Sequence, residues 1–530
     1  MTLTQDLFPA LRADAAVNAA DPHAAAADAA ATGPAPLRRL FRLRPDVIVS
    51  ADGDDVELTH PWGRQRVHAL GAATVTRLAR LAEQDADADV LAADPEAARL
   101  IRLLERFPFL VTTVLADADG PLATAVPIAR AATLPPVHPA DVSPDVPAHT
   151  PVVLSRFAYL RRLPEENSGA CVVESPLASY RVTLHQPSAG AFVAALTSLR
   201  QVAQAAGVAG LPVAAGEALA GLLAGTGLLE PAAGADSGDP ALWDFHDLLF
   251  HSRSRAGRHD YPSGGIFAHP DQPQLPAVPG AGPREDGPGV DLPVPDWAQV
   301  VSRDPAFSEV LEGRRSVRSY GDEPVTVDQL GELLYRAARV RRVIPGDPES
   351  PTAYDIVDRP YPAGGSTGEL EVYLSVAECE GLEPGVYRYD AAAHRLQPRH
   401  WSGAADEAAF RELLTAAWRA TNCTVEPQVL ITVTSRFGRL SWKYSQIAYA
   451  LTLKHVGVLY QTLYLVATAM GLGPCGLGSG DTDAAARALG LDWTTESSVG
   501  EFLIGSRPDG PAAVGRGFAD VVAESRESFV

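Results

Sequence analysis

The sequence WKYSQIAYALTLKHVGVLYQTLYLVATAMGLGPCGLGSGD, Trp442 to Asp481, decides the fold of this chain. After Lys443 and Tyr444, apolar residues recur at helical spacing, which predicts one long helix of about seven turns that begins at this pair. So wide an apolar stripe indicates a helix buried on most sides. Because Lys454 and His455 interrupt the run, it is shorter than the roughly 18 apolar residues of a membrane span. We therefore expect a core helix.

A glycine-rich loop ends this predicted helix. Its glycines are Gly471, Gly473, Gly476, Gly478 and Gly480. Glycine permits a positive φ and lets a ligand come close to the backbone. The lysine and tyrosine at one end of the helix and the glycine loop at the other are therefore predicted to share a pocket.

Composition narrows the class of protein. A chain of 530 residues holds about two to four domains. Its formal charge of −21 opposes binding to nucleic acid or to anionic membranes. The four cysteines lie far apart and form no C-x-x-C, so neither a zinc site nor a disulfide framework is indicated. The alanine-rich start does not resemble a signal peptide, and we expect a cytoplasmic protein.

The N-terminal half predicts two small α+β modules. Residues 1–36 show little periodicity, and we expect a flexible leader. Residues 37–135 and 150–230 both alternate short strand-like runs with helices, and both have a winged-helix-like outline. The second module's helices carry little positive charge, which favours scaffolding, dimerisation or peptide binding over DNA binding. The main predicted helices are Ala72–Glu83, Ala189–Ala205 and Ala214–Leu228.

Residues 231–297 are predicted to separate these modules from a C-terminal domain. Trp243 to Tyr261 is dense in histidine and arginine, but His246 and His251 are not an i, i+4 pair. This spacing favours a solvated or phosphate-facing helix end over a metal site. Pro262 to Pro295 is rich in proline and glycine, which predicts a linker without helix or sheet.

The C-terminal domain, residues 298–530, contains three further motifs. RRSVR, from Arg314 to Arg318, concentrates donors that suit a phosphate. PAGG precedes a strand-like run, and its glycines would let backbone amides reach a planar ligand. The final strand-like run ends in IGSR, where Arg507 again suits a phosphate. Taken singly, RRSVR is equally typical of a surface arginine cluster, and PAGG is equally typical of an ordinary turn. The Lys-Tyr pair alone is equally typical of two side chains that pack at the start of a helix.

Taken in order, RRSVR, PAGG, WKY, the long helix, GLGPCGLG and IGSR resemble the FMN-dependent nitroreductase superfamily. WKY is similar to its SagB-type branch, the azoline oxidases that convert peptide thiazolines and oxazolines to thiazoles and oxazoles. The resemblance covers about residues 300–530. It implies an α+β fold, with a nitroreductase-like FMN domain preceded by winged-helix-like modules. Related oxidases can carry such modules for leader-peptide recognition, which favours that role for residues 37–230.

The resemblance also implies which residues bind FMN. The arginine and serine segment would hold the phosphate and ribityl chain, and the two glycine loops would hold the ring. Relatives often have serine where this chain has Ala363, so one side-chain hydrogen bond to the flavin is in question. The predicted cofactor-binding residues are Arg314, Arg315, Ser316, Arg318, Pro362, Ala363, Gly364, Gly365, Gly476, Leu477, Gly478 and Arg507. No metal is predicted.

The implied chemistry is azoline dehydrogenation. We hypothesise that Lys443 abstracts the acidic proton next to the carbonyl while Tyr444 hydrogen-bonds the ring or relays the proton, and the sequence equally allows the reverse. The flavin accepts the hydride because no side chain can, and oxygen then reoxidises it. The expected partners are a precursor peptide with azoline rings and a cyclodehydratase. The family builds its flavin pocket from two subunits, so a homodimer is also expected.

Two other functions stay open at the level of sequence. A generic NAD(P)H-dependent nitro or quinone reductase would keep both the fold and the flavin, and rapid NAD(P)H oxidation would indicate it. A peptide-presenting scaffold with a degenerate flavin site would keep only the fold. A colourless protein that binds leader peptide but no FMN would indicate this second alternative.

Overall fold

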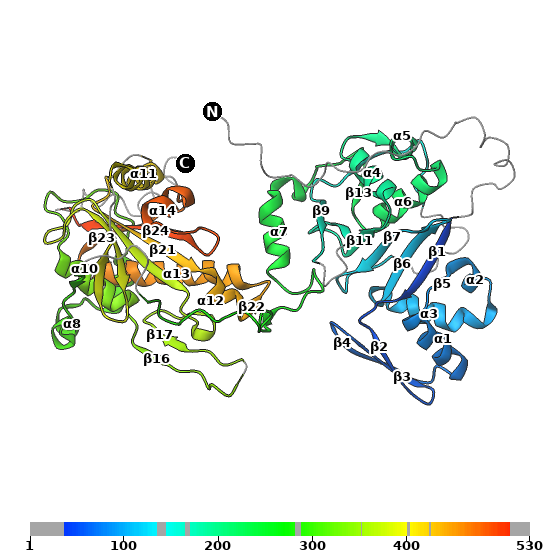
Figure 1. The fold of residues 1–530 in the computed structure, drawn as a ribbon, viewed down its shortest axis with the longest axis horizontal. Coiled ribbons are helices and arrows are strands. Elements are labelled where there is room, and N and C mark those ends of the chain that lie inside the picture. The colour runs from blue at the N-terminus through cyan, green and yellow to red at the C-terminus, as the bar shows by residue number, and fades with distance from the viewer. Residues whose placement is uncertain are drawn as a thin grey trace, which may run out of the picture. The chain divides into compact units, whose positions relative to one another are not determined.

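The computed structural model describes residues 37–134, 145–164, 170–280, 288–350, 352–399, 403–422 and 426–508. The predicted leader, residues 1–36, lies outside them. The chain divides into two compact units, Met1–Phe245 and His246–Val530. Both units combine helices with antiparallel sheets, which confirms the predicted α+β class (Figure 1).

One seven-stranded antiparallel sheet organises the N-terminal unit. Its strands, in spatial order, are β5 (Ala86–Asp87), β1 (Arg38–Leu43), β6 (Val111–Asp117), β7 (Gly120–Pro127), β11 (Tyr180–Leu184), β10 (Cys171–Glu174) and β9 (Tyr159–Arg162). Strand β7 belongs to the first predicted module and β11 to the second. They pair directly, with Ala125 opposite Val182. The two predicted modules therefore share one sheet.

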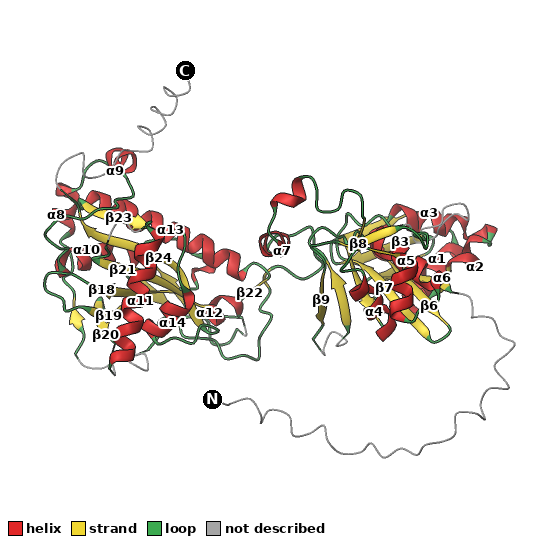
Figure 2. Ribbon diagram, turned by 90° about the horizontal axis from the view of Figure 1, so that it is seen from above, coloured by secondary structure: helices red, strands yellow, loops and turns green. Residues whose placement is uncertain are grey.

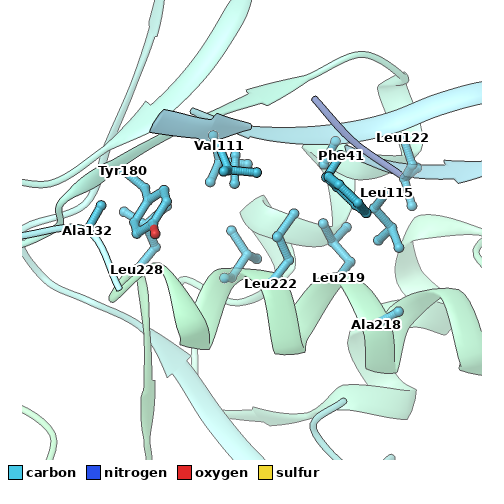
Figure 3. Close-up of a cluster of buried hydrophobic side chains, with 14 of the residues drawn as sticks. Phe41, Val111, Leu115, Leu122, Ala132, Tyr180, Ala218, Leu219, Leu222 and Leu228 are labelled. Atoms are coloured by element: carbon cyan, nitrogen blue, oxygen red, sulfur yellow. The ribbon is translucent and has the colours of Figure 1, made fainter. Parts of the chain in front are cut away.

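The helices of this unit also share one core. They are α1 (Ala72–Glu83), α2 (Ala88–Ala92), α3 (Ala98–Arg106), α4 (Pro187–Ala195), α5 (Val202–Ala209) and α6 (Val213–Gly225). Leu219 and Leu222 of α6 point toward Phe41 of β1 and Val111 of β6 (Figure 3). Smaller sheets complete the unit: β2 (Ile48–Asp52), β3 (Asp55–His60) and β4 (Gly63–Val67), and then β12 (Arg200–Gln201), β8 (Pro151–Leu154) and β13 (Leu229–Pro231).

The prediction of a single helix over Ala189–Ala205 is wrong, because the chain turns after α4. Thr197 Oγ1 donates a hydrogen bond to Ala194 O at 2.8 Å. Arg200 Nε donates to Ala195 O, also at 2.8 Å. These side chains satisfy the last carbonyls of α4 and end it, since such groups at a helix terminus need partners from outside the helix. Apolar periodicity did not reveal this stop.

A second seven-stranded antiparallel sheet forms the centre of the C-terminal unit. Its strands, in spatial order, are β15 (Val290–Asp291), β20 (Arg395–Pro398), β19 (Gly385–Asp390), β18 (Leu370–Val376), β21 (Val429–Arg436), β24 (Glu496–Ser506) and β23 (Leu472–Gly476). Helices α10 (Val327–Ala338) and α13 (Ala448–Ala469) pack on one face, and α11 (Ala404–Ala420) and α14 (Thr482–Leu489) pack on the other (Figure 2). Every residue of the central strand β21 is buried.

The remaining helices, strands and turns of the two units are short. They are α7 (Phe245–Arg253), α8 (Trp297–Arg303), α9 (Phe307–Gly313), α12 (Phe437–Ser441), β14 (Gly264–Gly265), β22 (Tyr444–Ser445), β16 (Arg342–Ile344), β17 (Ile356–Asp358) and the 3-10 turns η1 (Pro95–Ala97), η2 (Pro108–Leu110), η4 (Asp239–Leu242) and η5 (Gly364–Ser366).

The long helix α13 begins at Ala448, so the prediction that it begins at Lys443 is wrong. Gln446 has a φ of 63°, a left-handed conformation that a right-handed helix cannot contain.

The predicted linker contains pieces of sheet. Strand β14 pairs with β22, with Gly265 opposite Tyr444, and β15 pairs with β20. Residues 264–277, which we call the strap, are also held by side chains of the C-terminal unit. Arg436 donates to Pro276 O at 2.7 Å, and Arg439 donates to Leu275 O at 2.9 Å. The expectation of a segment without sheet is therefore wrong, and the C-terminal unit begins before residue 298.

Within the described residues, no single helix has the length and apolar character needed to cross a membrane. Helices α5 and α6 meet that test only as a pair, and the chain bends by 114° between them. Both helices contribute buried side chains to the core of the N-terminal unit.

Candidate functional site

Lys443 and Tyr444 lie beside the glycine pair Gly364–Gly365. Lys443 Nζ donates a hydrogen bond to the hydroxyl of Tyr354, and its nitrogen lies 4.2 Å from the centroid of that ring. The Tyr354 hydroxyl donates to Gly365 O at 2.8 Å. We call Tyr354, Gly365, Lys443 and Tyr444 the lysine cluster. The structure thus brings the predicted Lys-Tyr pair and the predicted PAGG loop together.

The polar ends of the lysine cluster converge on one point above Gly365. A Cβ built on Gly365 would lie 2.5 Å from Lys443 Nζ, 2.8 Å from the Tyr444 hydroxyl and 2.9 Å from the Tyr354 hydroxyl. Gly365 also has a φ of 62°. Only glycine combines this conformation with the necessary space. The convergence gathers one amine and two hydroxyls, which are groups that can accept, donate or relay a proton.

Sequence reasoning did not identify Tyr354. It lies in the irregular loop before β17, where no periodicity or motif marks it. Its neighbour in the sequence, Asp355, gives its backbone carbonyl to a hydrogen bond from Arg439. Only the folded chain brings this loop to Lys443.

His455 of α13 holds the other glycine of the pair. The backbone N–H of Gly364 donates to His455 Nε2 at 2.7 Å, and His455 Nδ1 bonds the carboxylate of Glu369. Since Nε2 accepts a hydrogen bond, Nδ1 carries the proton and donates it to Glu369. Burial raises the pKa of Glu369, but the interactions with His455 and the hydrogen bonds from Thr367 and the backbone together outweigh burial, and the pKa lies below its ordinary value. A buried pair therefore fixes the position of the PAGG loop.

Arg439 joins the segments around the lysine cluster. It is 1% exposed and donates to Thr367 O at 2.8 Å, to Leu275 O at 2.9 Å and to Asp355 O. Burial lowers its pKa. One guanidinium thus connects the PAGG loop, the strap and the loop that carries Tyr354.

The predicted phosphate segment meets the predicted glycine loop at a different place on α13. The hydroxyl of Tyr464 lies 2.7 Å from Ser316 Oγ and accepts a hydrogen bond from the backbone N–H of Gly476 at 2.6 Å. The guanidinium of Arg314 lies over the Tyr464 ring, 5.1 Å from its centroid. We call Arg314, Ser316, Tyr464 and Gly476 the arginine cluster. Its half-buried arginine and hydroxyls could hold a phosphate.

The other predicted binding residues lie around these two clusters. Arg315 donates to Glu312 O at 2.6 Å, so its guanidinium is partly engaged by the local backbone. Arg318 and Arg507 are exposed, and the backbone of Ser506, next to Arg507, bonds Gly321. In the PAGG loop, Pro362 is exposed and Ala363 is half-buried. No contact of these five side chains assigns them to a ligand, and their role stays a prediction.

A cavity of about 260 Å³ opens beside the glycine loop. Leu477, Gly478 and Gly480 line one side of it, and Glu501 of β24 lines another. Glu501 is 6% exposed, and its Oε1 has no hydrogen-bond partner among the described residues. Burial raises the pKa of its carboxyl group, which favours the protonated form. The cavity therefore offers a buried hydrogen-bonding group to the polar edge of a ligand.

The two clusters lie on opposite sides of α13. His455, which holds Gly364, and Tyr464 are nine positions apart in the sequence. On a helix this separation is about 14 Å of rise and two and a half turns. That the Lys-Tyr pair and the glycine loop share one pocket therefore stays a prediction. Among the residues that the structure describes, no group of three or more His, Cys, Asp or Glu side chains could hold a metal ion.

Two family models match this chain. Residues 311–506 match the model described as nitroreductase family, and residues 152–260 match the model described as cyanobactin oxidase ThcOx. The first match contains both clusters but not the strap, and the second lies mostly in the N-terminal unit. Over 197 residues the chain is 28% identical to a curated protein of Methanocaldococcus jannaschii that is named a putative nitroreductase, and the match covers 36% of this chain and 86% of that protein.

Two solved structures that match this chain have a lower sequence identity to it. A putative nitroreductase from Anabaena variabilis is 16% identical to this chain. The match covers 89% of this chain and 80% of that protein's chain, with a TM-score of 0.34. The E. coli microcin synthetase McbBCD complex with truncated pro-MccB17 bound contains a chain that is 20% identical. That match covers 51% of this chain and 95% of the other, with a TM-score of 0.31.

Proposed function

We propose that this chain, whose residues 311–506 match the nitroreductase family model and whose residues 152–260 match the cyanobactin oxidase model, is an FMN-dependent oxidase of peptide azolines. It removes two hydrogens from thiazoline or oxazoline rings in a ribosomally made peptide and leaves thiazoles or oxazoles. The match to the nitroreductase family model supports oxidoreductase chemistry. That the substrate is an azoline goes beyond this match, and the geometry of the site supports it.

The convergence of the lysine cluster carries this proposal. An azoline is oxidised only if a base removes the proton next to the carbonyl while a hydride leaves the neighbouring carbon. Lys443 Nζ lies close to the hydroxyls of Tyr444 and Tyr354, so a proton taken up by the amine has adjacent groups to stabilise or relay it. A plain reductase of quinones or nitro compounds needs no such base for its substrate.

The arginine cluster and the cavity support FMN as the cofactor. Arg314 and Ser316 suit its phosphate, and the orphaned Glu501 Oε1 suits the polar edge of its ring. Gly480 packs so closely on the Glu501 carboxyl that a Cβ there would overlap it, which indicates a cradle shaped around the cavity. When bound, FMN supplies the hydride acceptor that no side chain provides.

In this mechanism the neutral amine of Lys443 takes the ring proton and becomes an ammonium ion. Tyr354 already accepts a hydrogen bond from Nζ and stabilises the charge that forms. Tyr444 orients the substrate ring or passes the proton onward. His455 and Glu369 keep Gly364 in place, so the loop under the reacting ring does not shift. Oxygen serves as the final oxidant and restores the enzyme.

We propose that the N-terminal unit binds the leader of the precursor peptide. The cyanobactin-oxidase match and the shared sheet support this role. Strand β9 is the last strand of that sheet, and its Leu160 is 54% exposed, so an extended peptide could add to this edge. A cyclodehydratase that forms the azolines would act before this enzyme, and both would work in the cytoplasm.

We also propose a homodimer. His455, beside the lysine cluster, and Tyr464, in the arginine cluster, lie nine positions apart on α13, which favours a flavin held between two copies of the chain. A second copy could bring its lysine cluster to the arginine cluster of the first. On α13, Tyr449, Leu453 and Gly457 form an exposed stripe at i, i+4 spacing that could pack against a partner.

Absorbance and substitution test the proposed function together. Purified protein should show flavin bands, and a synthetic peptide with one thiazoline should lose two hydrogens by mass spectrometry. Lys443→Arg should keep the flavin and lower kcat by about 10²- to 10⁴-fold, because a guanidinium stays protonated and cannot act as a base. Tyr444→Phe should lower kcat without releasing FMN.

Lys454→Arg is the matched control, because Lys454 is exposed on α13. It should leave both flavin and turnover unchanged. Unimpaired thiazole formation by Lys443→Arg would refute the role of the amine. Rapid NADH oxidation without any thiazole product would instead identify a generic reductase, and a colourless protein that binds the peptide would identify a scaffold.

A further inference from the structure

We infer that Tyr354 is the positioning residue for Lys443: its hydroxyl fixes the amine in one direction, so that the neutral amine presents its lone pair away from Tyr354. The inference rests on the proposed function for its chemistry but on the contacts of Tyr354 for its geometry. Neither the matched families nor the motifs of the sequence assign Tyr354 a role.

The composition of the chain shows that an amine at position 443 is exceptional. Of the 44 lysines and arginines in the sequence, only Lys443 and Lys454 are lysines. Every other cationic position of this kind is filled by arginine, whose guanidinium stays protonated in proteins. Lys454 is exposed, whereas Lys443 is half-buried in the lysine cluster. Lysine, unlike arginine, can lose its proton and then accept one, so a lysine at position 443 suits a proton-accepting role.

The direction of the hydrogen bonds follows from counting protons. The Tyr354 hydroxyl has one proton, which it donates to Gly365 O at 2.8 Å. Its oxygen can therefore only accept from Lys443 Nζ. A neutral amine in this bond uses an N–H toward Tyr354 and keeps its lone pair free. The same bond holds the ammonium form after the proton has been taken up.

Tyr354 can fix Lys443 because it is itself held from several sides. Arg439 donates to the carbonyl of the next residue, Asp355, and its guanidinium lies 5.8 Å from the centroid of the Tyr354 ring. The ring of Trp442 also packs edge-to-face with the Tyr354 ring, at a centroid distance of 6.4 Å. The backbone of Lys443 is fixed as well, because Phe267 N donates to Lys443 O at 3.1 Å.

The charged and titratable groups around this amine come from five segments. Tyr444 lies on β22, Tyr354 on the loop before β17, Arg439 on α12, His455 on α13, and Glu369 directly before β18. Among these groups, Tyr354 makes the direct bond to Nζ. Removing its hydroxyl should therefore release the amine while the ring and the surrounding charges remain.

Lysine NMR of the full chain tests the positioning directly, because two lysines give two sets of signals. With 13Cε-labelled lysine, the two Hε protons of Lys443 should have distinct shifts in the wild type, since a fixed side chain does not average them. The signals of the exposed Lys454 should be averaged. Tyr354→Phe should collapse the Lys443 pair toward a single averaged shift, and Lys454→Arg identifies the signal. A Lys443 pair that stays distinct in Tyr354→Phe would overturn the inference.

Turnover of the thiazoline peptide supplies the second measurement. Tyr354→Phe should lower kcat by roughly 10- to 100-fold and leave KM near the wild-type value, because the amine is misplaced while substrate contacts remain. Tyr335→Phe removes a hydroxyl from a half-buried tyrosine of α10, outside both clusters, and should change neither signal nor rate. Wild-type kcat in Tyr354→Phe would overturn the inference. If wild-type protein makes no thiazole, the proposed function fails, and the NMR comparison still decides whether Tyr354 holds Lys443.

Discussion

Gly365 offers a direct test at the scale of single residues. Gly365→Ala places a Cβ 2.5 Å from Lys443 Nζ in a backbone conformation with a φ of 62°. The substitution should displace the amine and add a backbone strain of about 1–2 kcal/mol, so kcat should fall more than stability. Turnover and urea unfolding measure the two effects. Gly207→Ala, in helix α5 with no atom near the new Cβ, should stabilise slightly and leave kcat unchanged.

The buried pair of Glu369 and His455 predicts a pH effect on stability. The pKa of Glu369 is lowered in the folded protein, so its stabilising contribution is complete above the ordinary carboxyl pKa of about 4.3. The contribution is lost as the pH falls through the lower folded value. Glu369→Gln should cost about 1–3 kcal/mol at neutral pH and show less loss on acidification.

Urea unfolding at neutral and acidic pH measures the difference between Glu369→Gln and the wild type. Glu407→Gln is the control, because Glu407 is half exposed and pairs with Arg411 one turn along α11. An acid response of Glu369→Gln equal to that of the wild type would contradict the assignment of this carboxylate.

The sequence predicted part of the residue-level site. Lys443, Tyr444, Gly364 and Gly365 stand out because two unusual motifs contain them, and the structure brings them together. Their role as flavin and substrate contacts stays a prediction. Tyr354 could not be predicted, because its partner lies 89 residues away and its loop has no repeating pattern.

At the scale of elements, Arg439 predicts that the strap is part of the folded unit. Arg439→Gln should leave carbonyls of Thr367, Leu275 and Asp355 without their donor and destabilise the protein by about 3 kcal/mol or more. Hydrogen exchange should then increase in the strap and at β22. Arg411→Gln on the exposed face of α11 should cost about 0.5 kcal/mol or less. Unchanged exchange in the strap would contradict the anchoring role.

Most long elements could be predicted because their apolar spacing is regular. Helix α1 matches its predicted bounds, Ala72–Glu83, and α13 was predicted as the long core helix. Errors lie where single residues override that spacing: Gln446 delays the start of α13, and Thr197 with Arg200 ends α4. The short strands of the predicted linker depend on partners far along the chain, which local proline and glycine content does not reveal.

At the scale of the whole molecule, the exposed stripe of α13 predicts self-association. Leu453→Asp places a charge in this stripe and should shift the protein toward a monomer, because burying an unpaired charge at an interface is unfavourable. FMN content should fall together with the dimer if the pocket needs both copies. Size-exclusion chromatography with light scattering and the flavin absorbance measure both quantities.

Leu242→Asp is the matched control for this prediction. Leu242 lies in the N-terminal unit and is 88% exposed, so the same change should alter neither mass nor flavin content. A Leu453→Asp protein that remains dimeric and fully loaded with FMN would exclude this stripe as the interface.

The overall organisation was harder to predict than its parts. Both predicted N-terminal modules exist as mixed α and β segments, but β7 and β11 join them into one sheet with one core. Strand pairing over more than 50 residues depends on edge complementarity, which a single sequence does not display. The winged-helix assignment of each half stays a prediction.

The strap determines at which residues this chain could be recombined with a segment of another protein. A recombination point inside residues 264–277 would replace the backbone that pairs with Tyr444 and the carbonyls that Arg436 and Arg439 bind. A crossover upstream of Gly264 would leave those contacts intact. Chimaeras that join the C-terminal unit to a foreign N-terminal unit should therefore keep the whole strap with the C-terminal unit.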